Sequence, residues 1–274
     1  MTTAPTPAFR TYALLGDPVS QSSSPRIQNA AFAAAGIRAT YRAIRVSEAQ
    51  VVPQLRALAE AGGGGNVTAP HKQVAVQALD VPSEAVRRTG AVNTFWLGPD
   101  GVRGENTDVV GFRDALAHHG FVLQGQPVLL LGAGGAAAAV LLALLQADCL
   151  VTVVNRSPDR ARELIARLAD CGAAHWAPVP PPEPFTAVVN ATSLGMRPTD
   201  PHPLDIDRLP PGAAVIDLVY APGATRWVRA ALAAGHRACD GAEMLLRQAA
   251  AAFSLWTGRP APLEVMRAAF ASPA

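Results

Sequence analysis

The sequence predicts an α/β protein with two domains, and three observations carry this prediction. Short apolar segments of strand length alternate with longer helical segments, which is typical of open sheets covered by helices. A glycine-rich turn between a strand and a long apolar helix marks a second unit in the second half. A length of 274 residues, 50% of them hydrophobic, is enough for two modest domains with buried cores.

The predicted elements of the first half follow from turn and capping signals. Residues 12–15 form a strand that ends at Gly16, and Ser24-Pro25 opens a helix with proline in its first turn. The others are a strand over 40–46, a helix over 47–61 with a glycine break over 62–65, a strand that ends at Thr68, a helix that begins at Pro70, and a strand over 91–97 with a turn over 98–101.

A predicted helix over 107–119 leads into the second unit. The elements that follow are strands over 127–131, 150–154, 186–190 and 213–218, helices after the glycine turn and over 158–169, and closing helices over 242–256 and 262–271. Because the closing helices come after the last strand of the second unit, we expect them to return to the first domain. The predicted domains are residues 1–107 with 242–274, and residues 108–241.

Composition excludes several classes of protein. A formal net charge of +2 is too small to indicate nucleic acid or an acidic membrane as a partner. No apolar run is long enough to span a bilayer, and residues 1–9 lack the basic and apolar regions of a secretory signal. The three scattered cysteines form no Cys-x-x-Cys pair, which favours free thiols in a cytoplasmic protein, and no cluster has metal-ligand spacing.

The glycine turn is Gly132-x-Gly134-x-x-Ala137, placed between a predicted strand and a predicted helix. The first glycine permits the turn, and the second lets backbone N–H groups approach a pyrophosphate at the helix N-terminus. The small third residue lets the helix pack closely on the strand. This context predicts a Rossmann-like dinucleotide-binding domain.

The next predicted strand discriminates between cofactors. An NAD site usually has an acidic residue about 20 residues after the glycine turn, but this chain has Asn155-Arg156-Ser157 there, followed by Arg160. Arginine binds a 2′-phosphate through charge-assisted hydrogen bonds, so the sequence favours NADP. The alternative is that these arginines only solvate the start of a helix.

Lys72 is the one lysine among 23 lysine and arginine residues. Arginine stays charged under ordinary conditions, whereas a lysine amine can give up a proton. A site that needs only positive charge could use arginine at this position, whereas a site that must pass a proton could not. Chance survival of one lysine in an arginine-rich composition explains the same observation, so the prediction depends on the neighbouring residues.

Four segments of the first domain place small polar groups at predicted strand ends and helix starts. They are residues 22–25, 66–72, 91–94 and 104–108. Ligands of open α/β sheets collect at the carboxyl ends of strands, and hydroxyl and amide groups suit a polyhydroxylated substrate. Helix capping and turn formation explain many of these residues singly, so the prediction rests on the four segments together.

With motifs of the second unit, these segments resemble the shikimate dehydrogenase family, and the match runs nearly from one end of the chain to the other. The matching motifs are Gly16-Asp17-Pro18 with Ser22-x-Ser24-Pro25, Asn66-Val67-Thr68-x-Pro70-x-Lys72, Asn106-Thr107-Asp108-x-x-Gly111-Phe112, Asn155-Arg156-Ser157 with Arg160, Asn190-Ala191-Thr192-Ser193-x-Gly195-Met196, Asp217-x-Val219-Tyr220-x-Pro222, and Gly241-x-x-Met244 with Gln248. The resemblance implies reversible, NADPH-dependent reduction of 3-dehydroshikimate to shikimate, a cytoplasmic step of the chorismate pathway to aromatic amino acids, carried out by a monomer or homodimer.

The resemblance also implies a role for each matching position. Lys72 and Asp108 are the implied catalytic pair. The implied substrate ligands are Ser22 and Ser24 on the carboxylate, Asn66, Thr68, Asn93, Asp108 and Gln248 on the hydroxyls, and Lys72 and Tyr220. The implied cofactor ligands are Gly132, Ala133, Gly134, Gly135, Ala136, Asn155, Arg156, Ser157, Arg160, Thr192, Ser193, Met196, Leu218, Gly241 and Met244. Packing at a strand end explains Tyr220 nearly as well.

The chain departs from the family pattern at two positions. Gln21 and Gln28 stand where the family often has histidine, and neither carries an implied role. Relatives that prefer quinate often have threonine in place of the second serine of the carboxylate segment, so Ser24 favours shikimate.

A mechanism follows from the catalytic pair. Lys72 is predicted to donate a proton to the ketone oxygen, or to stabilise charge on it, and a positioned acid is worth about 10²–10⁴-fold in rate. Asp108 lies at a predicted helix N-terminus, where the macrodipole favours negative charge. We assign it as the partner that orients Lys72 and as a substrate ligand. The reverse division of these roles stays open.

Three other functions fit parts of the sequence. A quinate- or aminoshikimate-preferring dehydrogenase would have the same motifs. A catalytically silent, NADP-responsive regulator would share the fold but would need neither Lys72 nor Asp108. A Rossmann methyltransferase would leave Arg156 and Arg160 without a purpose.

Overall fold

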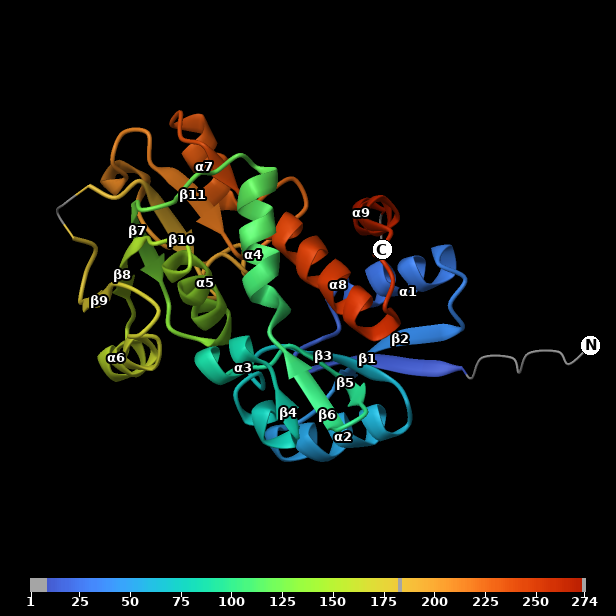
Figure 1. Cartoon of the computed structure of the whole chain (residues 1–274). Coiled ribbons are helices and arrows are strands. Elements are labelled where there is room, and N and C mark those ends of the chain that lie inside the picture. The colour runs from blue at the N-terminus through green and yellow to red at the C-terminus, as the bar shows by residue number, and fades with distance from the viewer. Residues whose placement is uncertain (1–8, 182–183, 273–274) are drawn as a thin grey trace, which may run out of the picture. The chain divides into compact units, whose positions relative to one another are not determined.

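The computed structural model describes residues 9–181 and 184–272, so the prediction about a secretory signal lies almost entirely outside the described residues. The chain forms two compact units. Unit 1 comprises Met1–Thr107 and Ala249–Ala274, and unit 2 comprises Asp108–Gln248. The second crossing between units falls inside a helix, whereas the predicted domains place all of 242–274 with the first. Figure 1 shows the elements of both units.

Unit 1 contains an open mixed sheet. Its strands are β1 (Arg10–Gly16), β2 (Ala39–Arg45), β3 (Gly64–Val67), β4 (Val81–Pro82), β5 (Thr94–Gly98) and β6 (Gly101–Glu105). Their order across the sheet is β2-β1-β3-β5-β6-β4. Strand β1 is parallel to β2 and β3, whereas β5 is antiparallel to both β3 and β6. This arrangement confirms the predicted mixed sheet.

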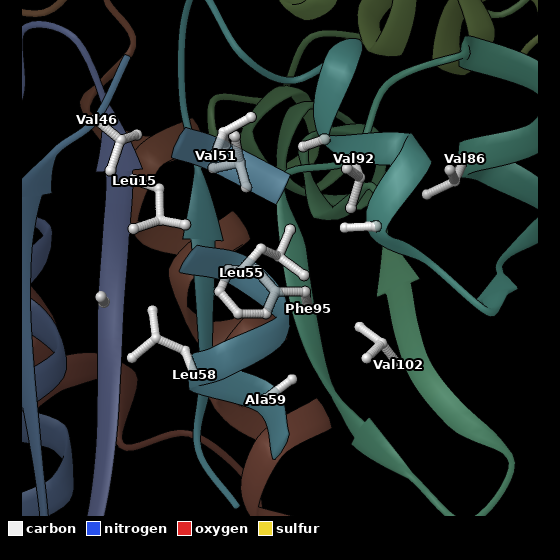
Figure 2. Packing of buried hydrophobic residues seen from close by; sticks show 14 residues of the cluster. Leu15, Val46, Val51, Leu55, Leu58, Ala59, Val86, Val92, Phe95 and Val102 are labelled. Carbon is white, nitrogen blue, oxygen red and sulfur yellow. The ribbon is translucent and has the colours of Figure 1, made fainter. Parts of the chain in front are cut away.

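The helices of unit 1 cover this sheet. They are α1 (Ser24–Ala34), α2 (Glu48–Glu60), the 3₁₀ helix η1 (Val74–Ala78), α3 (Glu84–Thr89), the end of α8 (Ala242–Thr257), and α9 (Leu263–Ala271). Figure 2 shows α2 directing Val51, Leu55 and Leu58 against strand residues that include Leu15 and Phe95. These side chains are almost fully buried and form the core that fixes the sheet behind the candidate site.

One prediction for unit 1 is wrong in detail. No α-helix begins at Pro70, because the backbone carbonyl of Lys72 accepts a hydrogen bond from Val92 N–H at 2.8 Å instead of from a residue one turn later. The glycine run does end α2, as predicted, and β3 begins within it at Gly64. Close approach of β1 explains the glycine at position 65, because a Cβ there would lie 2.1 Å from the backbone oxygen of Ala13.

Unit 2 contains a parallel sheet. Its strands are β7 (Pro127–Leu131), β8 (Leu150–Val154), β9 (Ala174–Ala177), β10 (Ala187–Asn190), β11 (Ala214–Asp217) and β12 (Ala238–Cys239). Their order is β12-β11-β10-β7-β8-β9, and each neighbouring pair is parallel. The direction of strand progression reverses between β7 and β10, as in Rossmann folds, which confirms the predicted second sheet.

The helices of unit 2 include two that the sequence analysis did not predict. The full set is α4 (Thr107–His118), α5 (Gly135–Leu145), α6 (Pro158–Arg167), η2 (Ile206–Arg208), α7 (Arg226–Ala233) and the start of α8. The helices α7 and η2 are short, as are the unpredicted strands β9 and β12. Thr225 caps α7 by accepting a hydrogen bond from Val228 N–H at 3.2 Å.

The closing helices return to unit 1, as predicted. The side chain of Arg26 on α1 donates to the backbone oxygen of Phe270 at 2.8 Å. Trp256 on α8 donates through Nε1 to the backbone oxygen of Phe95 at 3.2 Å, and its ring lies 4.8 Å from that of Tyr12. These contacts close the sheet face opposite to α2.

Candidate active site

One edge of the sheet in unit 1 collects most of the predicted substrate ligands. Leu15 pairs with Val67 where β1 and β3 end, and Asn66 pairs with Thr94 at the start of β5. Thr94 in turn pairs with Glu105 at the end of β6. Because β5 runs antiparallel to its neighbours, its beginning meets their carboxyl ends. Three of the four polar segments therefore share this edge.

Asn66 is the centre of a buried hydrogen-bond network at this edge. Its Nδ2 donates to the backbone oxygen of Asn93 and to Thr94 Oγ1, both at 2.9 Å. Its Oδ1 accepts from the hydroxyl of Tyr41 at 2.8 Å. Asn66 is 6% exposed, so all three hydrogen bonds form away from bulk water.

Asn93 connects this network to the helix that carries Asp108. Its Oδ1 accepts from the backbone N–H of Thr107 at 2.7 Å and lies 3.1 Å from the Thr107 hydroxyl. The amide orientation is therefore fixed, since a backbone N–H can only donate, and Nδ2 must lie on the other side of the side chain. Asp108 is the next residue after Thr107, and it is buried in the first turn of α4.

The predicted carboxylate segment is joined to the end of β3 by backbone contacts. Thr68 N–H donates to the oxygen of Leu15 at 2.8 Å, and Asp17 N–H donates to that of Ala69 at 3.3 Å. A Cβ at Gly16 would lie 2.4 Å from a Thr68 side-chain carbon, so a larger residue there would force the Thr68 side chain to move. The hydroxyl of Ser22 accepts from Ser24 N–H at 3.2 Å at the start of α1.

Lys72 lies next to the same edge through its backbone, because its carbonyl accepts from Val92, one residue before Asn93. Its side chain is partly buried. The neighbouring His71 is 3% exposed, and its Nε2 lies 2.8 Å from the backbone oxygen of Val46. Since that oxygen can only accept, Nε2 carries the proton.

The glycine turn of unit 2 lies at the reversal of strand order. Gly132 has φ of +113°, and a Cβ there would lie 2.8 Å from the backbone oxygen of Ala191 in the loop after β10. Gly134 caps α5, and a Cβ there would meet no atom within 4 Å. The first N–H groups of α5 have no acceptor within the helix. This open, donor-rich turn fits a pyrophosphate.

A buried carboxylate closes the loops after β10 and β11. Asp217 is fully buried, and it accepts from Asn190 Nδ2 at 2.8 Å, from Val219 N–H at 3.1 Å and from the Thr225 hydroxyl at 2.8 Å. Burial raises the pKa of Asp217, although these three donors and their hydrogen bonds oppose the rise.

The Asp217 network reaches the glycine turn through Asn190. Asn190 Oδ1 accepts from the N–H of Thr192 at 3.0 Å and from its hydroxyl at 2.7 Å. Its Nδ2 also donates to the backbone oxygen of Leu194 at 3.0 Å. The loop that carries Thr192 and Ser193 is thereby held against Gly132.

The loop after β8 carries the residues predicted to choose the cofactor. Asn155 Nδ2 donates to the backbone oxygen of Ser157 at 2.8 Å, which shapes the turn before α6. Arg156 and Arg160 are exposed there. Arg162 differs from them, because its guanidinium lies 4.6 Å from the centre of the Trp176 ring. The loop therefore offers exposed positive charge and no carboxylate at the position where an NAD site has one.

The last predicted cofactor residues come together at the start of α8. Gly241 N–H donates to Val219 oxygen at 3.0 Å, and a Cβ at Gly241 would lie 2.1 Å from the oxygen of Leu218. Farther along α8, Gln248 packs against Gly111 of α4, where a Cβ would lie 2.8 Å from the Gln248 side chain. Gly111 lies one turn after Asp108 on the same helix face.

The sequence did not indicate the residues that fix the predicted substrate- and cofactor-binding side chains and loops. The sequence places Tyr41 only within the predicted strand over 40–46, and nothing in it marks Thr225. Asp217 was noted only as part of a motif. A buried tyrosine or carboxylate carries no signal in the sequence that separates a hydrogen-bonding role from a packing role.

Residues 9–181 and 184–272 contain neither a candidate membrane span nor a candidate metal cluster. No helix there combines the length and apolarity needed to cross a bilayer. No group of three or more histidine, cysteine, aspartate or glutamate side chains in those ranges is arranged to hold a metal ion.

Known protein families match three parts of the chain. The shikimate dehydrogenase substrate binding domain matches residues 14–95, and shikimate / quinate 5-dehydrogenase matches residues 115–175. The shikimate 5'-dehydrogenase C-terminal domain matches residues 241–269.

Individual relatives match almost the whole chain. The shikimate dehydrogenase (NADP(+)) of Moorella thermoacetica is 43% identical over 267 residues, which covers 93% of this chain and 90% of the relative. A crystal structure of shikimate 5-dehydrogenase from Thermus thermophilus in complex with NADP(H) and shikimate is 36% identical, with a TM-score of 0.83 and coverage of 96% and 98%. Quinate dehydrogenase from Corynebacterium glutamicum in complex with NAD is 30% identical, with a TM-score of 0.85 and coverage of 96% and 98%.

Proposed function

The chain belongs to the shikimate dehydrogenase family, and from this membership we propose that it catalyses the reversible, NADPH-dependent reduction of 3-dehydroshikimate to shikimate in the chorismate pathway to aromatic amino acids. One observation carries the proposal. The amide and hydroxyl groups of Asn66, Asn93 and Thr94 form one buried network at a sheet edge, and Lys72 is bonded through its backbone beside it.

The two domains divide the work. Residues 1–107 with 242–274 bind the substrate, and residues 108–241 bind NADP. Cys149, Cys171 and Cys239 form no disulfide with one another, which supports a reducing, cytoplasmic location. The protein acts as a monomer or homodimer on a small molecule, without nucleic acid or a membrane.

The substrate ligands follow the chemistry of each group. Ser22 and Ser24 bind the carboxylate at the start of α1. Asn93 donates through Nδ2, because its Oδ1 already accepts from Thr107. The remaining substrate ligands are Asn66, Thr68, Lys72, Asp108, Tyr220 and Gln248.

Lys72 and Asp108 carry the proton chemistry. Bound NADPH supplies the hydride. Lys72 donates a proton from Nζ to the ketone oxygen as this becomes the hydroxyl of shikimate, and takes a proton back in the reverse direction. Asp108 orients Lys72 and accepts a hydrogen bond from a substrate hydroxyl. Its place in the first turn of α4 favours negative charge.

The cofactor ligands follow the carboxyl edge of the parallel sheet. The turn from Gly132 to Ala136 holds the pyrophosphate through backbone N–H groups. Asn155, Arg156, Ser157 and Arg160 hold the adenosine 2′-phosphate. The remaining ligands are Thr192, Ser193, Met196, Leu218, Gly241 and Met244.

An absorbance assay tests the function directly. The purified protein is mixed with shikimate and either NADP or NAD, and formation of reduced nicotinamide is followed. We expect turnover with shikimate, with a kcat/KM higher for NADP than for NAD. Quinate is the comparison substrate, because Ser24 favours shikimate; a higher kcat/KM for quinate would assign the protein to the quinate-preferring alternative. No turnover with either substrate would contradict the proposal and favour a silent regulator.

A further inference from the structure

We propose that Tyr41 is a positioning residue for substrate recognition, which acts by fixing the side chain of Asn66; this inference rests on the proposed function. The Tyr41 hydroxyl donates to Asn66 Oδ1 at 2.8 Å. Tyr41 is 2% exposed, and burial raises the pKa of its hydroxyl well above the ordinary value of 10.0. Tyr41 therefore acts through Asn66 and not by direct contact with solvent or ligand.

Tyr41 is itself held from several directions. Asn29 of α1 brackets its backbone, because Asn29 Nδ2 donates to Tyr41 oxygen and Tyr41 N–H donates to Asn29 Oδ1, both at 2.8 Å. The Tyr41 ring lies 6.0 Å from that of Trp256, which α8 brings back to unit 1. Helix α1, strand β2 and helix α8 thus fix the direction in which the hydroxyl points.

The direction of every hydrogen bond at Asn66 can be assigned. The backbone oxygen of Asn93 can only accept, so the Asn66 atom that lies 2.9 Å from it is Nδ2. Oδ1 therefore faces Tyr41, whose hydroxyl must donate. Both Nδ2 protons are engaged, one by Asn93 and one by Thr94. Asn66 can then offer a ligand only its second Oδ1 lone pair.

A specific recognition chemistry follows from this assignment. Asn66 accepts a hydrogen bond from a substrate hydroxyl, whereas Asn93 donates one through Nδ2. Loss of the Tyr41 hydroxyl would leave Asn66 Oδ1 as a buried acceptor without its internal donor, and the amide could turn away from the substrate. The effect belongs to substrate binding, because the network lies within unit 1, whereas the glycine turn belongs to unit 2.

Tyr41→Phe tests the inference, with Tyr12→Phe as the matched control. Tyr12 is equally buried and also packs on Trp256, but it is not among the hydrogen-bond partners of Asn66. We expect Tyr41→Phe to raise the KM for shikimate about tenfold, the size of one lost hydrogen bond, and to leave the KM for NADP within about twofold. Tyr12→Phe should change neither KM. An unchanged KM for shikimate, or equal increases in the two variants, would overturn the inference.

A double variant separates positioning from general packing. If Tyr41 acts through Asn66, then Tyr41→Phe combined with Asn66→Ala should raise the KM for shikimate no more than Asn66→Ala alone. Additive increases would show an independent effect of Tyr41 and contradict the inference. The activity of the wild type separates failure of the proposed function from failure of this inference alone. An inactive wild type removes the proposed function and this inference with it, whereas an active wild type with a normal Tyr41→Phe variant removes only the inference.

Discussion

Each unit has a buried polar network at the carboxyl edge of its sheet, and the two networks differ in kind. In unit 1 the network consists of neutral groups, the amides of Asn66 and Asn93 and the hydroxyls of Tyr41, Thr94 and Thr107. In unit 2 it is centred on the carboxylate of Asp217, which accepts from side chains and backbone of the surrounding loops.

The difference indicates two ways of preparing a site. The network of unit 1 fixes which side-chain atoms donate and which accept, so that it can distinguish the hydroxyls of a ligand. In unit 2 the side chains of the network form hydrogen bonds to the surrounding loops. They fix the loop backbone beside the glycine turn, where backbone N–H groups are available to phosphates. A network of neutral groups suits a polyol. A carboxylate exposed at a phosphate site would repel the ligand, and the carboxylate of Asp217 is buried.

Removal of the amine from unit 1 should give the largest effect. We expect Lys72→Met to lower kcat by about 10²–10⁴-fold, because the ketone oxygen loses its proton donor. NADP affinity, measured by titration of the protein with the cofactor, should stay within about twofold. A parallel loss of NADP affinity would contradict the division of roles between the units.

Reversal of charge in unit 2 should affect the cofactor alone. Arg156→Asp should weaken NADPH binding by about 10- to 100-fold and NADH binding far less, because only NADPH carries a 2′-phosphate. Arg162→Asp is the matched control, since that guanidinium lies on Trp176 and 3.6 Å from Asp159. Fluorescence titration with the two cofactors measures both. Equal losses for NADPH and NADH would remove the assignment.

Removal of the buried carboxylate of Asp217 should have a smaller effect than the two substitutions above, and the effect should be on stability. Asp217→Asn places an amide NH₂ among donors, so we expect a loss of about 1–3 kcal/mol in unfolding free energy and weaker NADP binding. Thermal unfolding with and without NADP measures both effects. Unchanged stability would show that Asp217 does not hold the loops.

The difference in stability between the wild type and Asp217→Asn should depend on pH. Burial raises the pKa of Asp217 above its ordinary value of 3.8, and the nearby Asp240 adds to the rise. The folded state therefore holds this proton more tightly than the unfolded state, and the resulting stability is complete below 3.8 and lost as pH rises through the raised pKa. The melting-temperature advantage of the wild type over Asp217→Asn should shrink as the pH rises from 3.8 through the raised pKa. An advantage that grows with pH would contradict this account.

The reactivity of the three thiols should show the smallest differences, and it tests the packing of unit 2 without a substitution. Cys149 and Cys239 are buried, and burial raises the pKa of Cys239 to about 12. Cys171 is partly exposed. A thiol reagent at neutral pH should therefore label Cys171 first, and all three after denaturation. Rapid labelling of Cys239 in the native protein would show that the loops beside Asp217 open readily.

The sequence predicted the two sheets better than it predicted the supports of the site. Local patterns were enough for β7, the glycine turn and α5, because strand, turn and helix signals agree there. The predicted helix at Pro70 does not form, because Val92, which is 20 residues away in the sequence, donates a hydrogen bond to the carbonyl of Lys72. Likewise, nothing near Tyr41 in the sequence shows that it meets Asn66, because that contact depends on how β1 pairs with both β2 and β3.

The most direct measurement is the turnover of Lys72→Arg with shikimate and NADP. Arginine retains the positive charge but does not give up a proton under ordinary conditions, so the substitution separates the two properties. The account predicts a fall in kcat of about 10²-fold or more with near-normal NADP affinity. Near-normal turnover would contradict the role of Lys72 as the proton donor.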